Sequence, residues 1–211
     1  MPLFTSKSLH SVNCVLAFPQ GTDLPDNEKF SNLFSGELSK GMNFLDDPVI
    51  QSKILRVPQL QLQVVLEGQR LRIEDESSKE PEESILIEKV YEVYSKLFPQ
   101  KTALSGFGFN FDIYYQFGNV LDIKGAFEKI SPDGLTTMGS DLLDFGWQWT
   151  VSYKNAKRMD GYFLKITAPI ELKVHYNAHF GDNSLPDKKQ MEKIFKESYL
   201  QVDKTINSLS L

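Results

Sequence analysis

The chain has 211 residues, of which 41% are hydrophobic and 24% charged, and its formal net charge is −5 with a pI of about 5.3. A chain of this length forms one large domain or two small ones and buries about 70% of the surface of its unfolded form, so no disulfide or metal is needed for stability. The acidic balance argues against a nucleic-acid scaffold, which normally presents a basic face.

The single cysteine and the first residues of the chain exclude further classes. Cys14 has no second cysteine for an intrachain disulfide or a multi-cysteine zinc site, and it lies in an apolar run that predicts a buried strand. The N-terminal segment lacks the long apolar core of a signal peptide. No apolar stretch approaches the roughly 20 residues of a membrane span. We therefore expect a soluble, cytoplasmic protein with no membrane partner.

Four elements are expected in the first part of the chain. Residues 10–18 predict a strand, and a short helix over 28–34 follows a capping aspartate. Residues 53–75 predict a β-hairpin with its turn at Glu67-Gly68-Gln69. A helix is expected over about 82–98, because serines, early acids and a proline favour its start and an apolar stripe recurs at helical spacing.

Long strands dominate the rest of the sequence. Residues 104–117, 144–153 and 161–180 carry large apolar side chains at every second position, apart from a break near Ala168-Pro169. Successive side chains on a strand point to opposite faces, so each run places its large side chains on one side of the sheet. Residues 154–160 predict the polar tip of the hairpin between the second and third runs.

Two segments remain between and after these strands. Residues 119–130 fit either a continued strand or a short helix, and Ser131-Pro132-Asp133-Gly134 predicts a turn. The C-terminal segment 186–209 predicts an amphipathic helix of about six turns, after a start that resembles a capping box.

Together the elements predict an α+β fold, in which a large, twisted and mostly antiparallel sheet carries the helices at about 82–98 and 186–209 on one face. We expect a single domain over residues 1–211. Strands lead to an amphipathic helix in each of the halves 1–100 and 101–211, which fits either a distant duplication or a common way to cover an open sheet.

The order of these segments resembles that of a sporadically distributed family of uncharacterised bacterial and archaeal proteins. Members of that family have a strand, a variable helix, a hairpin, a helix that ends near Phe-Pro, a long strand and a closing helix. The resemblance carries over no catalytic residue. The family's long strand tends to open with Gly-Leu-Arg-Tyr, whereas this chain has Gly-Phe-Gly-Phe-Asn. The similar segments here are Val12–Phe18, Leu55–Ile73, Val90–Pro99, Gly106–Tyr114, Leu172–Phe180 and Met191–Leu209.

The sequence contains no phosphate-binding loop, nucleophile elbow, zinc-protease motif or calcium loop. His175 and His179 lie on the polar face of one predicted strand, but residues four apart on a strand are separated by about 13 Å. A single zinc ion needs both nitrogens at about 2 Å. We therefore expect no metal site, no catalytic residue and no cofactor.

The polar face of the predicted sheet holds the candidate ligand-binding residues, which are Asp112, Glu171, His175 and His179. Asp112 shares its face with Gly108 and Asn110, a combination that fits a concave or ligand-facing surface. A merely solvated face is the alternative interpretation.

These observations favour a non-enzymatic binding or protein-interaction module, because a sheet with one helix-covered face leaves the other face for a partner. The expected partner is a protein or a small molecule rather than a nucleic acid, and a second copy in a homodimer fits the same reasoning. The alternative is a small-molecule or lipid-binding protein with an apolar cavity between the curved sheet and the C-terminal helix. An enzyme ranks third, because the sequence shows no nucleophile–base pair.

Overall fold

The computed structural model describes residues 4–99, 102–119, 146–153 and 157–208. The first half of the chain contributes β1 (Phe4–Ala17), α1 (Asn27–Ser31), β2 (Asn43–Asp47), β3 (Ser52–Val57), β4 (Leu62–Glu67), β5 (Arg70–Asp75) and α2 (Leu86–Leu97). The second half contributes β6 (Gly106–Phe117), β7 (Gly146–Ser152), β8 (Arg158–Ala168), β9 (Glu171–Phe180) and α4 (Lys188–Ser208). Short 3₁₀ segments lie at Gly36–Ser39 and Pro58–Leu60.

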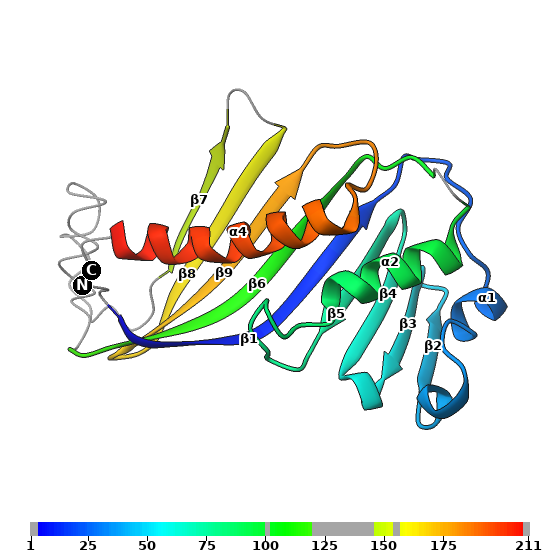
Figure 1. Ribbon diagram of the computed structural model, residues 1–211, viewed down its shortest axis with the longest axis horizontal. Coiled ribbons are helices and arrows are strands. Elements are labelled where there is room, and N and C mark those ends of the chain that lie inside the picture. Colours follow the sequence, from blue (N-terminus) through cyan, green and yellow to red (C-terminus); the bar gives the residue numbers. More distant parts are fainter. Residues whose placement is uncertain (1–3, 100–101, 120–145, 154–156, 209–211) are drawn as a thin grey trace.

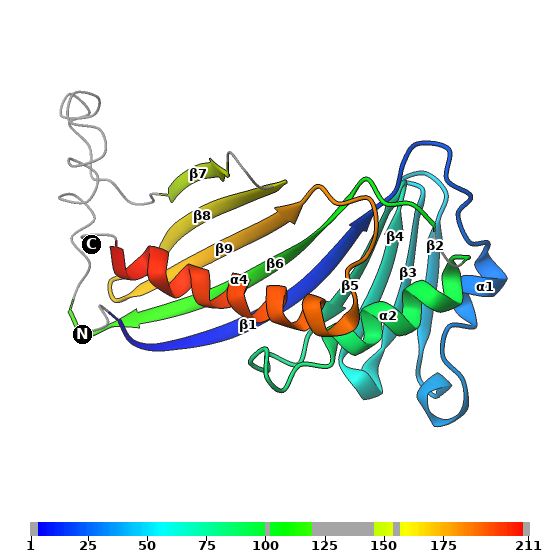
Figure 2. The same cartoon turned by 45° about the horizontal axis from the view of Figure 1, so that its top comes forward.

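The described strands form one open, antiparallel sheet of nine strands in the order β2-β3-β4-β5-β1-β6-β9-β8-β7. The sheet is strongly twisted, and α2 and α4 lie along the same face of it (Figures 1 and 2). This arrangement confirms the α+β fold that the sequence predicts.

Both halves of the chain are connected in the same way, with five strands in the first half and four described strands in the second. β1 and β6 pair at the centre of the sheet, and each is followed by a meander whose last strand returns to pair with it. Each meander then continues into a helix, α2 in the first half and α4 in the second. The two helices therefore point in opposite directions over the two halves of the sheet (Figure 1).

The large side chains of the alternating strands face the helices. Phe109 and Phe111 of β6 are completely buried, and their rings lie 5.1 and 5.5 Å from the ring of Phe195 in α4. Phe111 also contacts Tyr199 of α4, with ring centroids 5.6 Å apart. Aromatic pairs at such distances add to the free energy gained by burial alone. The closing helix is thus fixed to the sheet by aromatic packing.

The helix predicted from residue 82 begins later, at Leu86, because the chain before it is held to the end of β5. The buried carboxylate of Asp75 accepts hydrogen bonds from the Ser77 N–H at 2.9 Å and from the Ser84 hydroxyl at 2.6 Å. Ser84 Oγ in turn accepts the Leu86 N–H at 3.1 Å, which satisfies one of the unpaired donors of the helix start. Tertiary hydrogen bonds therefore override the local signals of residues 77–83.

Other boundaries also differ from the sequence prediction. The region up to residue 75 holds the additional strand β2, and β3 pairs with both β2 and β4. The expected polar tip over 154–160 is wrong at its end, because β8 starts at Arg158 and Asp160 is completely buried. The predictions for residues 120–130 and for the turn at 131–134 lie outside the described residues.

Candidate functional site

The face of the sheet opposite α2 and α4, here called the open face, carries a polar row across the nine described strands, interrupted only by the glycine of β8. Residues that pair directly across neighbouring strands share a face and lie close together. The Asn110 side chain donates to Oδ1 of Asn13 at 2.7 Å, and the Asn177 side chain donates to Oδ1 of Asn110. From β2 to β7 the row consists of Asn43, Arg56, Gln63, Glu74, Asn13, Asn110, Asn177, Gly161 and Thr150.

An aspartate–histidine pair lies next to this row. Nδ1 of His175 is 3.0 Å from Oδ1 of Asp112, and the Ser11 hydroxyl donates to Oδ2 of Asp112 at 3.2 Å. Burial raises the pKa of the Asp112 carboxyl, but the hydrogen bond and charge of His175, with the nearby Lys173, outweigh it and lower the pKa below its usual value. Because the carboxylate accepts from Nδ1, Nε2 is the ring nitrogen that His175 can offer to a partner.

A second carboxyl of the open face is shifted in the opposite direction. Burial raises the pKa of Glu74, Arg72 lowers it, and the charges of Glu76 and Asp112 raise it further, so that the net shift is upward. Asp112 is therefore the more strongly ionised of the two carboxyls.

The other two predicted site residues lie apart from this pair. Glu171 accepts hydrogen bonds from Gln116 at 2.6 Å and from Thr167 at 2.5 Å, at the opposite end of β9 from His179. His179 pairs with Gly108 across the β6–β9 ladder. The structure therefore brings Asp112 and His175 together and leaves Glu171 and His179 separate. Among the described residues, no group of three or more His, Cys, Asp or Glu side chains could hold a metal ion.

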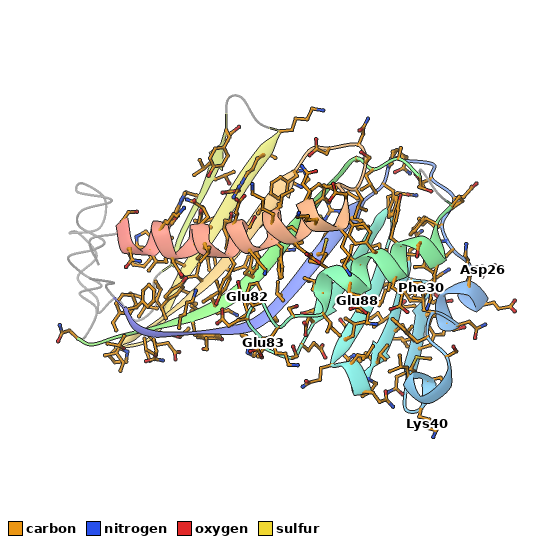
Figure 3. The ribbon with its side chains drawn as sticks, viewed as in Figure 1. Asp26, Phe30, Lys40, Glu82, Glu83 and Glu88 are labelled. Atoms are coloured by element: carbon orange, nitrogen blue, oxygen red, sulfur yellow. The ribbon has the colours of Figure 1, made fainter. Side chains whose placement is uncertain are left out.

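A pocket of about 250 Å³ lies on the opposite side of the molecule, where the N-terminal ends of α2 and α4 meet. Glu82, Glu88 and Glu192 line it together with Lys188 and Lys196. Figure 3 labels Glu82 and Glu88 at this place. The pocket lies between the two helices, not between α4 and the sheet, where aromatic rings fill the space.

Sequence reasoning missed a buried ion pair at the start of β8. Asp160 is completely buried, and it accepts hydrogen bonds from Arg158 at 2.7 and 2.9 Å and from the Tyr153 hydroxyl at 2.9 Å. Burial and the neighbouring Asp160 raise the pKa of Tyr153 to about 12. The spacing Arg-x-Asp, which puts both side chains on one face of a strand, was the available signal.

In comparisons with known proteins, no protein-family model and no curated protein matches this chain. None of the described helices is both long enough and apolar enough to cross a membrane.

The Asp112–His175 pair predicts a pH-dependent contribution to stability. A carboxyl whose pKa is lowered by folding stabilises the fold above its unfolded pKa of about 3.9, and this contribution disappears as pH falls through the lower, folded pKa. Asp112→Asn should therefore reduce the free energy of unfolding near neutral pH, and the difference from wild type should shrink as pH falls below the unfolded pKa of about 3.9 and through the lower, folded pKa. Urea unfolding at several pH values measures it, with the exposed Asp182→Asn as control. A difference that stays constant with pH would contradict the assignment.

Proposed function

We propose that the protein is a non-enzymatic interaction module that binds a protein partner through the open face of its sheet. The observation that supports this proposal is the contrast between the two faces. α2 and α4 cover one face, whereas none of the described helices covers the polar row on the other (Figures 1 and 2). Antiparallel sheets often have one solvated face, but here that face also has exposed Phe163 and Met159 beside Asn177 and His175.

A protein partner fits this surface better than a small molecule does. Small ligands usually bind in concave sites that bury most of their surface. The open face offers a broad sheet of polar side chains with a few apolar ones, which is typical of an interaction surface with a polar rim. The alternative of a lipid cavity under α4 stays a prediction, and the packing of Phe109, Phe111 and Phe195 does not favour it. The cytoplasmic location, the absence of a nucleic-acid partner and the homodimer also stay predictions.

Photo-crosslinking from a single introduced cysteine tests the proposal. Cys14 is completely buried and burial raises its pKa, so it should not react with a thiol-directed crosslinker. A Thr150→Cys variant places the label on the open face, and Glu197→Cys places it on the exposed side of α4. In a lysate of the cells that naturally produce the protein, we expect a saturable crosslink to a partner protein from position 150 and none from position 197. An excess of unlabelled wild type should prevent this crosslink. Equal adducts from both positions, or none from position 150, would contradict the proposal.

A further inference from the structure

β2 is the end strand of the nine-stranded sheet, and no described strand pairs with its outer edge (Figures 1 and 2). It pairs with β3 over all five of its residues, from Asn43 to Asp47, without a bulge. In such a ladder the N–H and C=O groups of alternate residues point away from the neighbouring strand, so the outer edge presents backbone groups that can pair with another strand. Four of the five residues of β2 are exposed, which shows that its edge is accessible.

Exposed apolar side chains accompany this edge on the open face. Leu45, at the middle of β2, is 58% exposed and pairs with Ile54 of β3, which in turn pairs with Val65 of β4. Val49, in the turn that follows β2, is 89% exposed. Edge strands are commonly protected by lysine, proline or a bulge, and β2 contains none of these. Burial of Leu45 against another strand would therefore be favourable.

The sequence of β2 allows this strand to pair with the same strand of a second copy. Directly opposite residues of an antiparallel pair lie on the same face, so a two-fold axis that keeps both open faces on one side passes through a residue of β2. Only an axis at Leu45 pairs all five residues, with Leu45 opposite Leu45, Asn43 opposite Asp47 and Phe44 opposite Asp46. No like charges face each other in this register, whereas an axis at Asp46 would place two aspartates opposite each other.

Charges at the rim of this arrangement are complementary between the two copies. Arg56 of β3 is exposed and makes no hydrogen bond or ion pair with a described residue, although its charge lowers the pKa of Glu74. It pairs with Asn43, so in the two-fold register it lies two strand spacings, about 10 Å, from the backbone of Asp47 in the second copy. Oδ1 of Asp47 accepts two backbone N–H groups of the following turn, and these bonds leave its charge without a counter-charge. The symmetry repeats this Arg56–Asp47 contact, once on each side of Leu45.

We propose that two copies of this chain associate through β2, antiparallel about a two-fold axis at Leu45, so that their sheets join into one continuous sheet. Leu45 and Ile54 of both copies form the apolar centre of the contact, and the two Arg56–Asp47 pairs form its rim. A five-residue edge buries less than a standard interface, so the dimer is weak, with a dissociation constant on the order of 10–100 µM. This inference does not depend on the proposed function, because the polar row stays accessible in the dimer.

Sedimentation equilibrium over a range of concentrations tests the association. Wild type should show a reversible monomer–dimer equilibrium. Leu45→Lys places two lysines opposite each other at the axis and should weaken association at least about tenfold. Leu200→Lys is the matched control, because Leu200 is a similarly exposed leucine on α4, at 53%, and this variant should dimerise like wild type. Urea unfolding of both variants checks that each one folds.

A charge exchange tests the register itself. Arg56→Glu places two pairs of acids at the rim of its own dimer, and Asp47→Lys places two pairs of bases there, so each variant alone should be largely monomeric. In a mixed dimer both rim contacts again join opposite charges. We therefore expect the two variants, one of them fluorescently labelled, to associate with each other at least about tenfold more tightly than either associates with itself.

Three results would overturn the inference. A wild type that stays monomeric at about 0.5 mM would exclude the dimer and leave the edge of β2 to a strand of a different protein. A Leu45→Lys variant that folds and dimerises like wild type would place the contact elsewhere on the molecule. A mixture of Arg56→Glu and Asp47→Lys that associates no better than the separate variants would exclude the two-fold register at Leu45. None of these results changes the crosslink expected from position 150.

Discussion

A chain that ends after Ser184 is expected to lose its cooperative unfolding transition. α4 contributes a row of almost completely buried side chains to the core, and burial of each large apolar side chain stabilises the fold by about 1.5–3 kcal/mol. The summed contribution, on the order of 10 kcal/mol, is comparable to the whole stability of a typical domain, about 5–15 kcal/mol. The buried side chains are Met191, Phe195, Tyr199, Val202 and Ile206.

Hydrogen bonds increase the expected effect of this truncation. Asp203 of α4 accepts from the Tyr115 hydroxyl at 2.7 Å and from the Lys7 ammonium at 2.7 Å, so deletion of the helix leaves both donors without their partner. The completely buried Tyr115 would then carry an unsatisfied hydroxyl or become exposed.

Urea unfolding followed by circular dichroism and tryptophan fluorescence measures the result. A chain that ends at Ser208 keeps all of the described α4 and is the matched control. The longer chain should show one cooperative transition, and the shorter chain a gradual change together with binding of a hydrophobic dye. A cooperative transition of the shorter chain at the midpoint of the control would show that α4 is not structural.

The fold could be predicted because its signals are local. The alternation of apolar and polar residues in β6 and β9 is visible within a short window, and so is the apolar stripe of α4. The same patterns indicate which face of each element lies in the core. The turn between β4 and β5, at Glu67-Gly68-Gln69, could also be predicted, because tight hairpin turns favour residues such as glycine.

The polar row of the open face could not be predicted, because it depends on the register between distant strands. Asn13, Asn110 and Asn177 lie in three strands that are far apart in the sequence, and only the β1–β6 and β6–β9 pairings align them. A shift of one residue in either pairing would turn an asparagine toward the core. Asp112 and His175 were both candidates, but their contact depends on the same β6–β9 register.

Asp160 shows a related limit. Within a window of a few residues it looks like part of a polar turn, since aspartate is common in turns, and the predicted strand therefore started only at Gly161. The structure places Asp160 inside β8 with its side chain in the core, because β8 pairs with β9 from Arg158 onward. The extent of a strand is thus set by its partner strand, which the local sequence does not reveal.

Asp160→Ala should lower the free energy of unfolding by about 3–5 kcal/mol. This is the largest effect that we predict for the substitution of a single charged residue. The carboxylate is completely buried and is bound by Arg158, whose guanidinium also donates to the Tyr176 hydroxyl at 2.9 Å. Removal of Asp160 leaves the Arg158 charge, 22% exposed, without its anion, and leaves the Tyr153 hydroxyl without its acceptor. Loss of one member of a buried pair costs far more than loss of a surface pair.

Two comparisons separate the buried pair from a general effect of charge removal. Glu197→Ala breaks the exposed Lys193–Glu197 pair of α4, at 3.8 Å, and should change the free energy of unfolding by less than about 1 kcal/mol. The double variant Arg158→Met with Asp160→Leu removes both charges and should recover much of the stability lost in Asp160→Ala, because a buried ion pair can be replaced by apolar side chains of similar volume. Urea unfolding of the four proteins under one set of conditions measures these differences. If the double variant is as unstable as Asp160→Ala, the loss comes from packing at the start of β8 and not from the unpaired charge of Arg158.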